Sequence, residues 1–132
     1  MNNRLPKKKH INLNIIGKKN IKTIGDWILL RWAIENVLKN AIDAIGTGSG
    51  YISIDLQSEK NYTYIFITDT GKGIPRKDWK NIFQPGFSSK LRGWGLGLSL
   101  TKRIIQDIHK GEIRVINSKP NKTTFKFTLP NI

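Results

Sequence analysis

Apolar residues recur every three or four positions between residues 26 and 45, and this spacing predicts an amphipathic helix. Asp26 is a suitable N-cap residue, because its carboxylate can accept from the first free backbone N–H groups. A glycine-rich stretch at 46–50 ends the helix. The predicted apolar stripe consists of Trp27, Leu30, Ile34, Leu38, Ala41 and Ile45.

Shorter segments that alternate between apolar and polar residues, or are continuously apolar, predict five strands, at 11–15, 51–57, 62–68, 112–117 and 123–129. The first is expected to be half-buried. The second and third flank a turn at 58–61, so they are expected to form a hairpin. The residues expected to face inward are Ile52, Ile54 and Leu56 in the second strand, and Thr123, Phe125, Phe127 and Leu129 in the last.

A second helix is predicted from Leu96 to about Lys110, with Gly111 well placed to follow its C-terminus. Its predicted apolar stripe is Leu96, Leu100, Ile104 and Ile108. A short helix is expected over 78–82. Pro, Gly and paired Ser residues among aromatics at 83–95 predict an irregular, lid-like loop whose stem Phe83 and Phe87 would anchor.

Composition limits the chemistry available to this chain. Its 132 residues fit one domain, which we divide into a basic arm at 1–10 and a folded domain at 11–132. There are no cysteines, which excludes disulfides, thiolate metal sites and cysteine nucleophiles, and His10 and His109 lie too far apart in sequence to suggest a metal site. No apolar run approaches the roughly 20 residues that cross a membrane. We therefore expect a cytoplasmic domain, whether or not the parent protein is membrane-anchored.

The charge of the chain is strongly positive, with a net value of +14 and a pI of about 10.3. Such a charge fits an anionic partner: nucleic acid, a membrane surface, a nucleotide or an acidic protein. Residues 1–22 contain seven basic residues and no acidic ones, so a solvated basic arm explains half of the excess equally well.

A candidate for ligand recognition is the loop after the third strand. Asp69 stands where that apolar strand ends, and Gly71 and Gly73 follow it. Glycine allows backbone to approach a ligand closely, so an acceptor beside exposed backbone suits a flat polar molecule. The same pattern also occurs in ordinary loops, and only groups from elsewhere in the chain can decide between the two readings.

Two further groups of residues supply such chemistry. Asn36, Asn40 and Asp43 lie on nearly the opposite side of the first helix from its apolar stripe, either as a solvated surface or as a polar wall facing a ligand. Glycines 93, 95 and 97 lie just before and within the first turn of the second helix, where free backbone N–H groups attract anions. The alternative is that these glycines only pack the helix start, and the Gly-Lys-Ser/Thr ending of a Walker loop is missing.

These features suit one ligand, a nucleoside triphosphate with Mg²⁺. Asp69 can accept from an exocyclic amine, which favours adenine. The amide-rich helix start can hold phosphates, and Lys90 and Arg92 can neutralise them. Asn40 offers a neutral oxygen to Mg²⁺, a cation that prefers oxygen ligands and keeps several waters.

Four segments in order resemble the N, G1, F and G2 boxes of the ATP-binding catalytic domain of sensor histidine kinases, in the Bergerat-fold (GHKL) ATPase superfamily. They are residues 35–41, 69–74, 83–90 and 93–100, and the resemblance covers about 11–130. It implies an α+β, two-layer sandwich: a mixed, mostly antiparallel sheet with helices on one face and an ATP lid.

The resemblance also implies roles for individual residues. Asn40 would carry Mg²⁺, with Asn36 assisting one turn earlier, and Asp69 would bind the adenine amino group with support from Thr123. The remaining ATP contacts would come from Gly71, Gly73 and Ile74 around the base, and from Lys90, Gly93, Gly95, Leu96, Gly97 and Leu98 around the phosphates.

The same resemblance implies a kinase. Hydrolytic branches of the superfamily have a glutamate four residues before the metal-binding Asn, but Asn36 stands there, and Glu35 is about 100° away around the helix. The expected acceptor is a histidine on a separate dimerisation domain, which would pass the phosphoryl group to a response regulator. Two alternatives remain open: an ATP-driven module acting on nucleic acid, although nucleic acid is not the partner we expect, and a non-enzymatic nucleotide sensor or basic scaffold.

Overall fold

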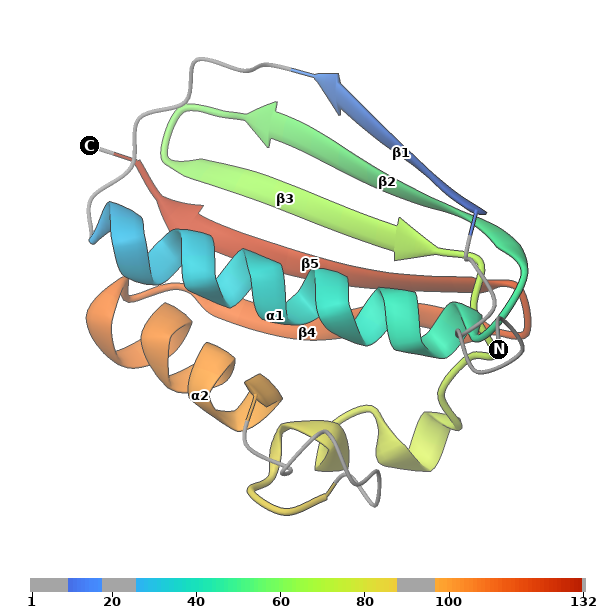
Figure 1. Cartoon of the computed structure of the whole chain (residues 1–132). Helices are drawn as coiled ribbons and strands as arrows, with labels where there is room; N and C mark the ends of the chain where they lie inside the picture. The colour runs from blue at the N-terminus through green and yellow to red at the C-terminus, as the bar shows by residue number, and fades with distance from the viewer. Residues whose placement is uncertain (1–9, 18–25, 88–96, 132) are drawn as a thin grey trace, which may run out of the picture.

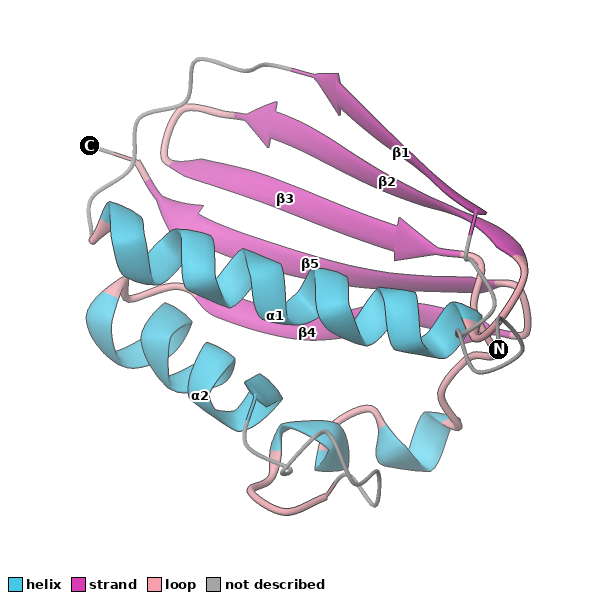
Figure 2. Ribbon diagram, viewed as in Figure 1, coloured by secondary structure: helices cyan, strands magenta, loops and turns pink. Residues whose placement is uncertain are grey.

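A five-stranded mixed sheet with helices against one face forms the architecture (Figures 1 and 2). The computed structural model describes residues 10–17, 26–87 and 97–131. Along the sheet the strands follow the order β1-β2-β3-β5-β4, with β1 parallel to β2 and the other neighbours antiparallel. The strands are β1 (His10–Gly17), β2 (Ser49–Ser58), β3 (Tyr62–Asp69), β4 (Glu112–Lys119) and β5 (Lys122–Pro130). The predicted α+β class and mixed sheet are confirmed.

All five predicted strands are present, and β2 and β3 form the expected hairpin. The inward-facing residues predicted for β5 are all buried. The first strand departs from its prediction, because Leu13 and Ile15, on the apolar face expected to be buried, are 54% and 46% exposed. The reason is position: β1 is an edge strand, and the helices cover the β3, β5 and β4 side of the sheet, away from β1 (Figure 1).

Helix α1 (Trp27–Ile45) begins as predicted, with the Asp26 carboxylate accepting from the N–H groups of Ile28 and Leu29. Its predicted stripe is partly wrong, since Trp27 is 73% exposed. The fully buried residues are instead Leu30, Ala33, Val37 and Ala41. The buried face is turned because α1 packs against both the sheet and the neighbouring helix α2.

The second helix changes its winding halfway. Helix α2 (Gly97–Arg103) is followed by a π-helical turn, η4 (Ile104–Ile108). A π turn contains extra backbone per turn and rotates the following side chains. As a result Ile105 is buried, whereas the predicted Ile108 is 47% exposed. Leu100, which precedes the π turn, is 37% exposed, and Leu96 lies outside the described residues.

The end of this segment is also built differently from the prediction. Lys110, not Gly111, adopts the positive φ, of 56°. Gly111 is required for another reason, because a Cβ there would stand 2.1 Å from the carbonyl oxygen of Thr128. His109 is buried and accepts from the N–H of Asp26 through Nε2, while its Nδ1 lies 3.0 Å from the Ile104 carbonyl oxygen. It thereby links the start of α1 to η4.

Between β3 and α2, the expected short helix at 78–82 is replaced by two single 3-10 turns, η2 (Arg76–Asp78) and η3 (Asn81–Phe83). Phe83 is buried and meets Phe125 edge to face, with ring centroids 6.2 Å apart. Phe87 is 42% exposed, so only one of the two predicted anchors enters the core.

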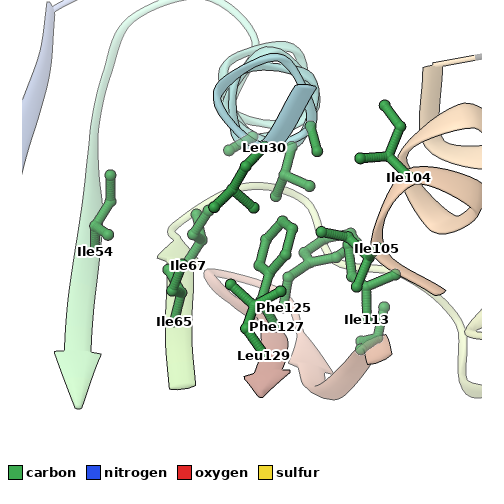
Figure 3. Packing of buried hydrophobic residues seen from close by; sticks show 14 of the residues in the cluster. Leu30, Ile54, Ile65, Ile67, Ile104, Ile105, Ile113, Phe125, Phe127 and Leu129 are labelled. Atoms are coloured by element: carbon green, nitrogen blue, oxygen red, sulfur yellow. The ribbon is translucent and has the colours of Figure 1, made fainter. Parts of the chain in front are cut away.

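The core lies between the sheet and the helices, and its members converge there from α1, η4 and the central strands (Figure 3). Phe125, Phe127 and Ile67 are essentially without solvent contact. Burying large apolar side chains contributes roughly 1.5–3 kcal/mol each. This packing fixes α1 above the sheet and thereby fixes the position of its polar residues.

Candidate functional site

Asp69 is the last residue of β3, and its side chain is 1% exposed. One carboxylate oxygen, Oδ1, accepts a 2.7 Å hydrogen bond from the N–H of Gly71. Burial raises the pKa of Asp69, and the Gly71 hydrogen bond opposes that shift. A buried carboxylate therefore has one oxygen engaged by its own loop, and no partner for the other is recorded in the described part of the chain.

The backbone after Asp69 runs directly against the end of α1. A Cβ on Gly71 would stand 2.6 Å from the Ala44 Cβ and 2.7 Å from its carbonyl carbon. The N–H of Lys72 donates to the Ala44 carbonyl oxygen at 3.0 Å. Gly71 is thus required for contact between loop and helix, a reason that the sequence pattern alone did not supply.

The β4–β5 hairpin holds the same loop from the other side. Gly73 has φ of +89°, and a Cβ there would lie 2.9 Å from the Lys119 carbonyl group. The N–H of Asn121 donates to the Gly71 carbonyl oxygen at 2.8 Å. The N–H of Ile74 donates to Ser118 Oγ at 2.7 Å.

Thr123 lies directly opposite Asp69 in the β3–β5 pairing and is 2% exposed. Ser118 lies opposite Thr123 in the β4–β5 pairing, and their hydroxyl oxygens are 2.7 Å apart. Three neighbouring strands therefore place Asp69, Thr123 and Ser118 in one row across the sheet.

Asn36 lies on the flank of α1 that faces α2, and Asn40 follows it one helical turn later. Asn36 and Asn40 are both partly buried, whereas Asp43 is exposed. The Nδ2 atom of Asn36 is the one buried side-chain N or O atom, among the described residues, that has no hydrogen-bond partner. Such orphan donors are rare in proteins, and a ligand or water normally completes them.

Helix α2 begins beside this flank. A Cβ on Gly97 would lie 3.7 Å from Asn36 Oδ1, so the helix start and the polar face of α1 are neighbours. The Gly97 carbonyl accepts from Thr101 Oγ1 at 2.8 Å, and Leu98 packs against the core. The predicted phosphate residues Lys90, Gly93, Gly95 and Leu96 lie outside the described residues, as does Arg92.

The fold thus brings together two sets of predicted residues. One is the loop with Asp69, Gly71, Gly73, Ile74 and Thr123; the other is Asn36, Asn40 and Gly97 between the two helices. Ser118, Asn121 and Ala44 hold the loop as well, and none of them was predicted to do so from the sequence. No local signal identified them, because they contact the loop only through tertiary structure.

The donor set agrees with an oxygen-liganded cation. In the described part of the chain no three His, Cys, Asp or Glu side chains gather to hold a metal. Asn side-chain oxygens are ligands for Mg²⁺, which usually takes the rest of its shell from water and substrate phosphates. Asn40 is partly buried and offers such an oxygen, whereas the unpaired Nδ2 of Asn36 can only donate and therefore suits a phosphate oxygen beside the cation.

Comparison with known proteins identifies the class. The catalytic domain of histidine kinase ThkA superposes with a TM-score of 0.82 at 30% identity, over 92% of this chain and 79% of that one. The structure of ThkA in complex with response regulator protein TrrA matches with a TM-score of 0.77 at 27% identity, over 92% of this chain and 34% of that one. The fold is therefore that of a histidine kinase catalytic domain.

Residues 25–132 match the family described as histidine kinase-, DNA gyrase B-, and HSP90-like ATPases, and the chain belongs to that family. Sporulation kinase C of Bacillus subtilis is 32% identical over 123 residues. The match covers 89% of this chain but only 28% of that kinase. No helix among the described residues is long and apolar enough to span a membrane.

Proposed function

We propose that this domain binds Mg²⁺–ATP and transfers the γ-phosphoryl group to a histidine on a separate dimerisation domain. The observation that carries the proposal is that α1 supports two distinct chemistries: its C-terminal end contacts the loop of the buried Asp69 carboxylate, and its Asn36, whose buried Nδ2 has no partner among the described residues, lies beside Gly97. Family membership supports ATP as the ligand.

Adenine recognition is assigned to the loop. Asp69 has one oxygen held by the Gly71 N–H, so the other is free to accept from the exocyclic amine of adenine. Thr123, opposite Asp69, supplies a hydroxyl at the same edge of the base. Gly71, Gly73 and Ile74 form the backbone that lies along the ring. Since this backbone is hydrogen-bonded in the ligand-free protein, little ordering is required on binding.

Phosphate and metal binding are assigned to the helices. Asn40 would hold Mg²⁺, which supplies charge stabilisation to the transferring phosphoryl group when bound. Asn36 would donate its unpaired N–H group to a phosphate oxygen. The backbone of Gly97 and Leu98, together with Lys90, Gly93, Gly95 and Leu96, would complete the phosphate contacts.

The reaction breaks the bond between the γ-phosphorus and its bridging oxygen, forms a P–N bond to histidine, and releases ADP. The residue four before Asn40 is Asn36, which cannot accept a proton from water as a carboxylate can. This favours transfer to a protein over hydrolysis. We also propose that the acceptor domain passes the phosphoryl group to a response regulator and that the domain is cytoplasmic. The proposal further divides the chain into an arm at 1–10 and a catalytic domain at 11–132.

The test is a phosphotransfer assay. The protein is mixed with radiolabelled ATP, Mg²⁺ and a helical phosphoacceptor domain from the same parent protein, and the product is treated with acid. An acid-labile histidine label is expected, and it should disappear with EDTA. Absence of label with this acceptor, or DNA-stimulated ATP hydrolysis instead, would overturn the proposal.

A further inference from the structure

Ser118 lies in a part of β4 where the strand pairing is interrupted. Ile113 and Val115 pair with Phe127 and Phe125 in regular alternation, and both are buried. A bulge between Val115 and Asn117 then shifts the register. Continued alternation would have turned Asn117 inward, but the extra residue turns Ser118 inward, opposite Thr123. β-Bulges commonly re-aim a side chain in this manner near functional sites.

The re-aimed hydroxyl has two polar neighbours, both at 2.7 Å: the N–H of Ile74 and the hydroxyl of Thr123. The Ile74 N–H can only donate, so Ser118 Oγ accepts there. The proton of Ser118 is then available to Thr123 Oγ1. If Ser118 donates to Thr123, the proton of Thr123 is directed elsewhere.

Asp69 decides between the two orientations of the hydroxyl pair. Asp69 lies opposite Thr123 on β3, whereas Ser118 lies opposite Thr123 on β4. When ionised, the Asp69 carboxylate can only accept hydrogen bonds. If Thr123 donated to Ser118, its lone pairs would be left near the carboxylate, which is unfavourable at a buried position. The orientation in which Ser118 donates to Thr123 avoids this and leaves the Thr123 proton on the side of Asp69.

An acceptor beside a donor complements one particular base edge. Adenine presents its exocyclic amine, a donor, next to N1, an acceptor. Hypoxanthine and guanine present the reverse order, a carbonyl oxygen next to an N1–H. We propose that Ser118 is a positioning residue for adenine recognition, which fixes the loop at Ile74 and orients the Thr123 hydroxyl as a donor toward N1, directly or through one water. This inference rests on the proposed function of the loop as the adenine site.

The test compares ATP with 1-deaza-ATP, in which a C–H replaces N1 while the amine is kept. Dissociation constants are measured by calorimetry for the whole chain and its variants. The wild type should bind ATP about three- to tenfold more tightly than 1-deaza-ATP, the value of one neutral hydrogen bond. In Ser118→Ala this ratio should fall toward one, because ATP loses affinity and 1-deaza-ATP does not. Ser118→Thr, which keeps a hydroxyl, should retain the ratio.

A matched control lies on the opposite face of the sheet. Thr68 and Thr124 form a similar cross-strand hydroxyl pair, 2.9 Å apart. Thr124→Val removes that pair without changing side-chain volume and should leave the ATP to 1-deaza-ATP ratio at the wild-type value. Ser118→Cys conserves volume and provides the same measurement if Ser118→Ala does not fold.

The outcomes separate the inference from the function on which it rests. Equal weakening of both nucleotides in Ser118→Ala and Ser118→Cys would reduce Ser118 to a structural role and overturn the inference, as would an unchanged ratio. In either case Asp69→Asn would still weaken ATP binding if the proposed function holds. A wild-type protein that binds no ATP would overturn the proposed function itself.

Discussion

The two parts of the site differ in how completely the protein satisfies their polar groups. We call the first the loop half, residues 69–74 with Ser118 and Thr123, and the second the helix half, Asn36, Asn40 and Gly97. In the loop half the N–H groups of Gly71, Lys72 and Ile74 all have partners within the fold. In the helix half, the Nδ2 atom of Asn36 is buried without a partner in the described part of the chain.

This difference indicates that the loop half and the helix half contribute differently to ATP binding. A loop whose hydrogen bonds are already formed loses little conformational freedom when it binds a base. An unpaired buried donor costs free energy in the ligand-free protein, which a phosphate oxygen would recover. We therefore expect base selectivity to reside in the loop half and dependence on Mg²⁺ and phosphates to reside in the helix half.

The largest effect is expected for Asn40→Ala, which removes the proposed metal ligand from the helix half. Phosphotransfer should fall by about a hundredfold, within the range seen when metal sites lose a supporting group. Binding of adenosine without phosphates, measured by calorimetry, should not change. Lys39→Ala, at the exposed neighbouring position, should leave both quantities unaltered. Normal phosphotransfer by Asn40→Ala would remove the metal assignment.

Asp69→Asn is the corresponding change in the loop half. The new amide can still accept from Gly71, but it presents an N–H toward the adenine amine. ATP affinity should fall by about ten- to a hundredfold, as for loss of a hydrogen bond to a charged group. Asp107→Asn, at an exposed carboxylate, serves as the control in the same calorimetric titration. Unchanged affinity in Asp69→Asn would contradict the adenine assignment.

Asp69→Asn should also change how the free energy of unfolding depends on pH. Burial raises the pKa of Asp69 in the folded state, so the folded protein holds this proton more tightly than the unfolded chain does. Wild-type stability should therefore decrease as pH rises from the unfolded value, about 3.9, through the raised folded value. The Asn side chain of the variant does not titrate in this window. The free energy of unfolding of the variant minus that of the wild type should therefore increase across the window and stay constant at higher pH. Urea titrations at several pH values measure this, and a constant difference would refute it.

Gly71→Ala tests whether the loop depends on its contact with α1. The added Cβ would overlap the backbone of Ala44, and such overpacking typically costs about 1–3 kcal/mol. Both the unfolding midpoint in urea and ATP affinity should fall. Gly48→Ala is the control, because a Cβ there would contact no other atom. Its φ of +102° means that backbone strain alone should lower the stability, and ATP affinity should not change. Equal ATP affinities in the two variants would show that the contact with Ala44 has no part in binding.

The smallest effect is expected for Asn36→Leu, and its sign is the informative part. Removing an unpaired buried amide should stabilise the ligand-free protein by about 1 kcal/mol, while phosphotransfer decreases. Lys39→Leu places the same side chain at an exposed position of α1 and should change thermal stability little. A loss of stability in Asn36→Leu, measured by thermal unfolding without nucleotide, would mean that the amide has a partner within the protein.

Much of this molecule follows from local pattern. Alternating or continuously apolar segments predicted all five strands, and the Asp26 cap predicted where α1 begins. The apolar stripes of both helices were less accurate. Trp27, Leu100 and Ile108 have suitable spacing but are exposed, because helix-to-helix contact and the π turn reset which side is covered.

In the candidate site, too, some residues were predicted from the sequence and others were not. Spacing identified Asp69 and the asparagines, since a carboxylate at a strand end and amides on one helix face are visible in one dimension. Ser118 was not identified, because the bulge that turns it inward depends on the pairing of β4 with β5.

The sequence alone determined the element types, the polar residues available and their resemblance to an ATP-binding family. Those properties depend on periodicity and residue chemistry, which are local. Tertiary structure alone decided that Gly71 packs against Ala44, that Asn36 Nδ2 is buried without a partner among the described residues, and that Asp69, Thr123 and Ser118 form one row. Each of these depends on the register of strands or the packing of helices, and so on residues that are distant along the chain.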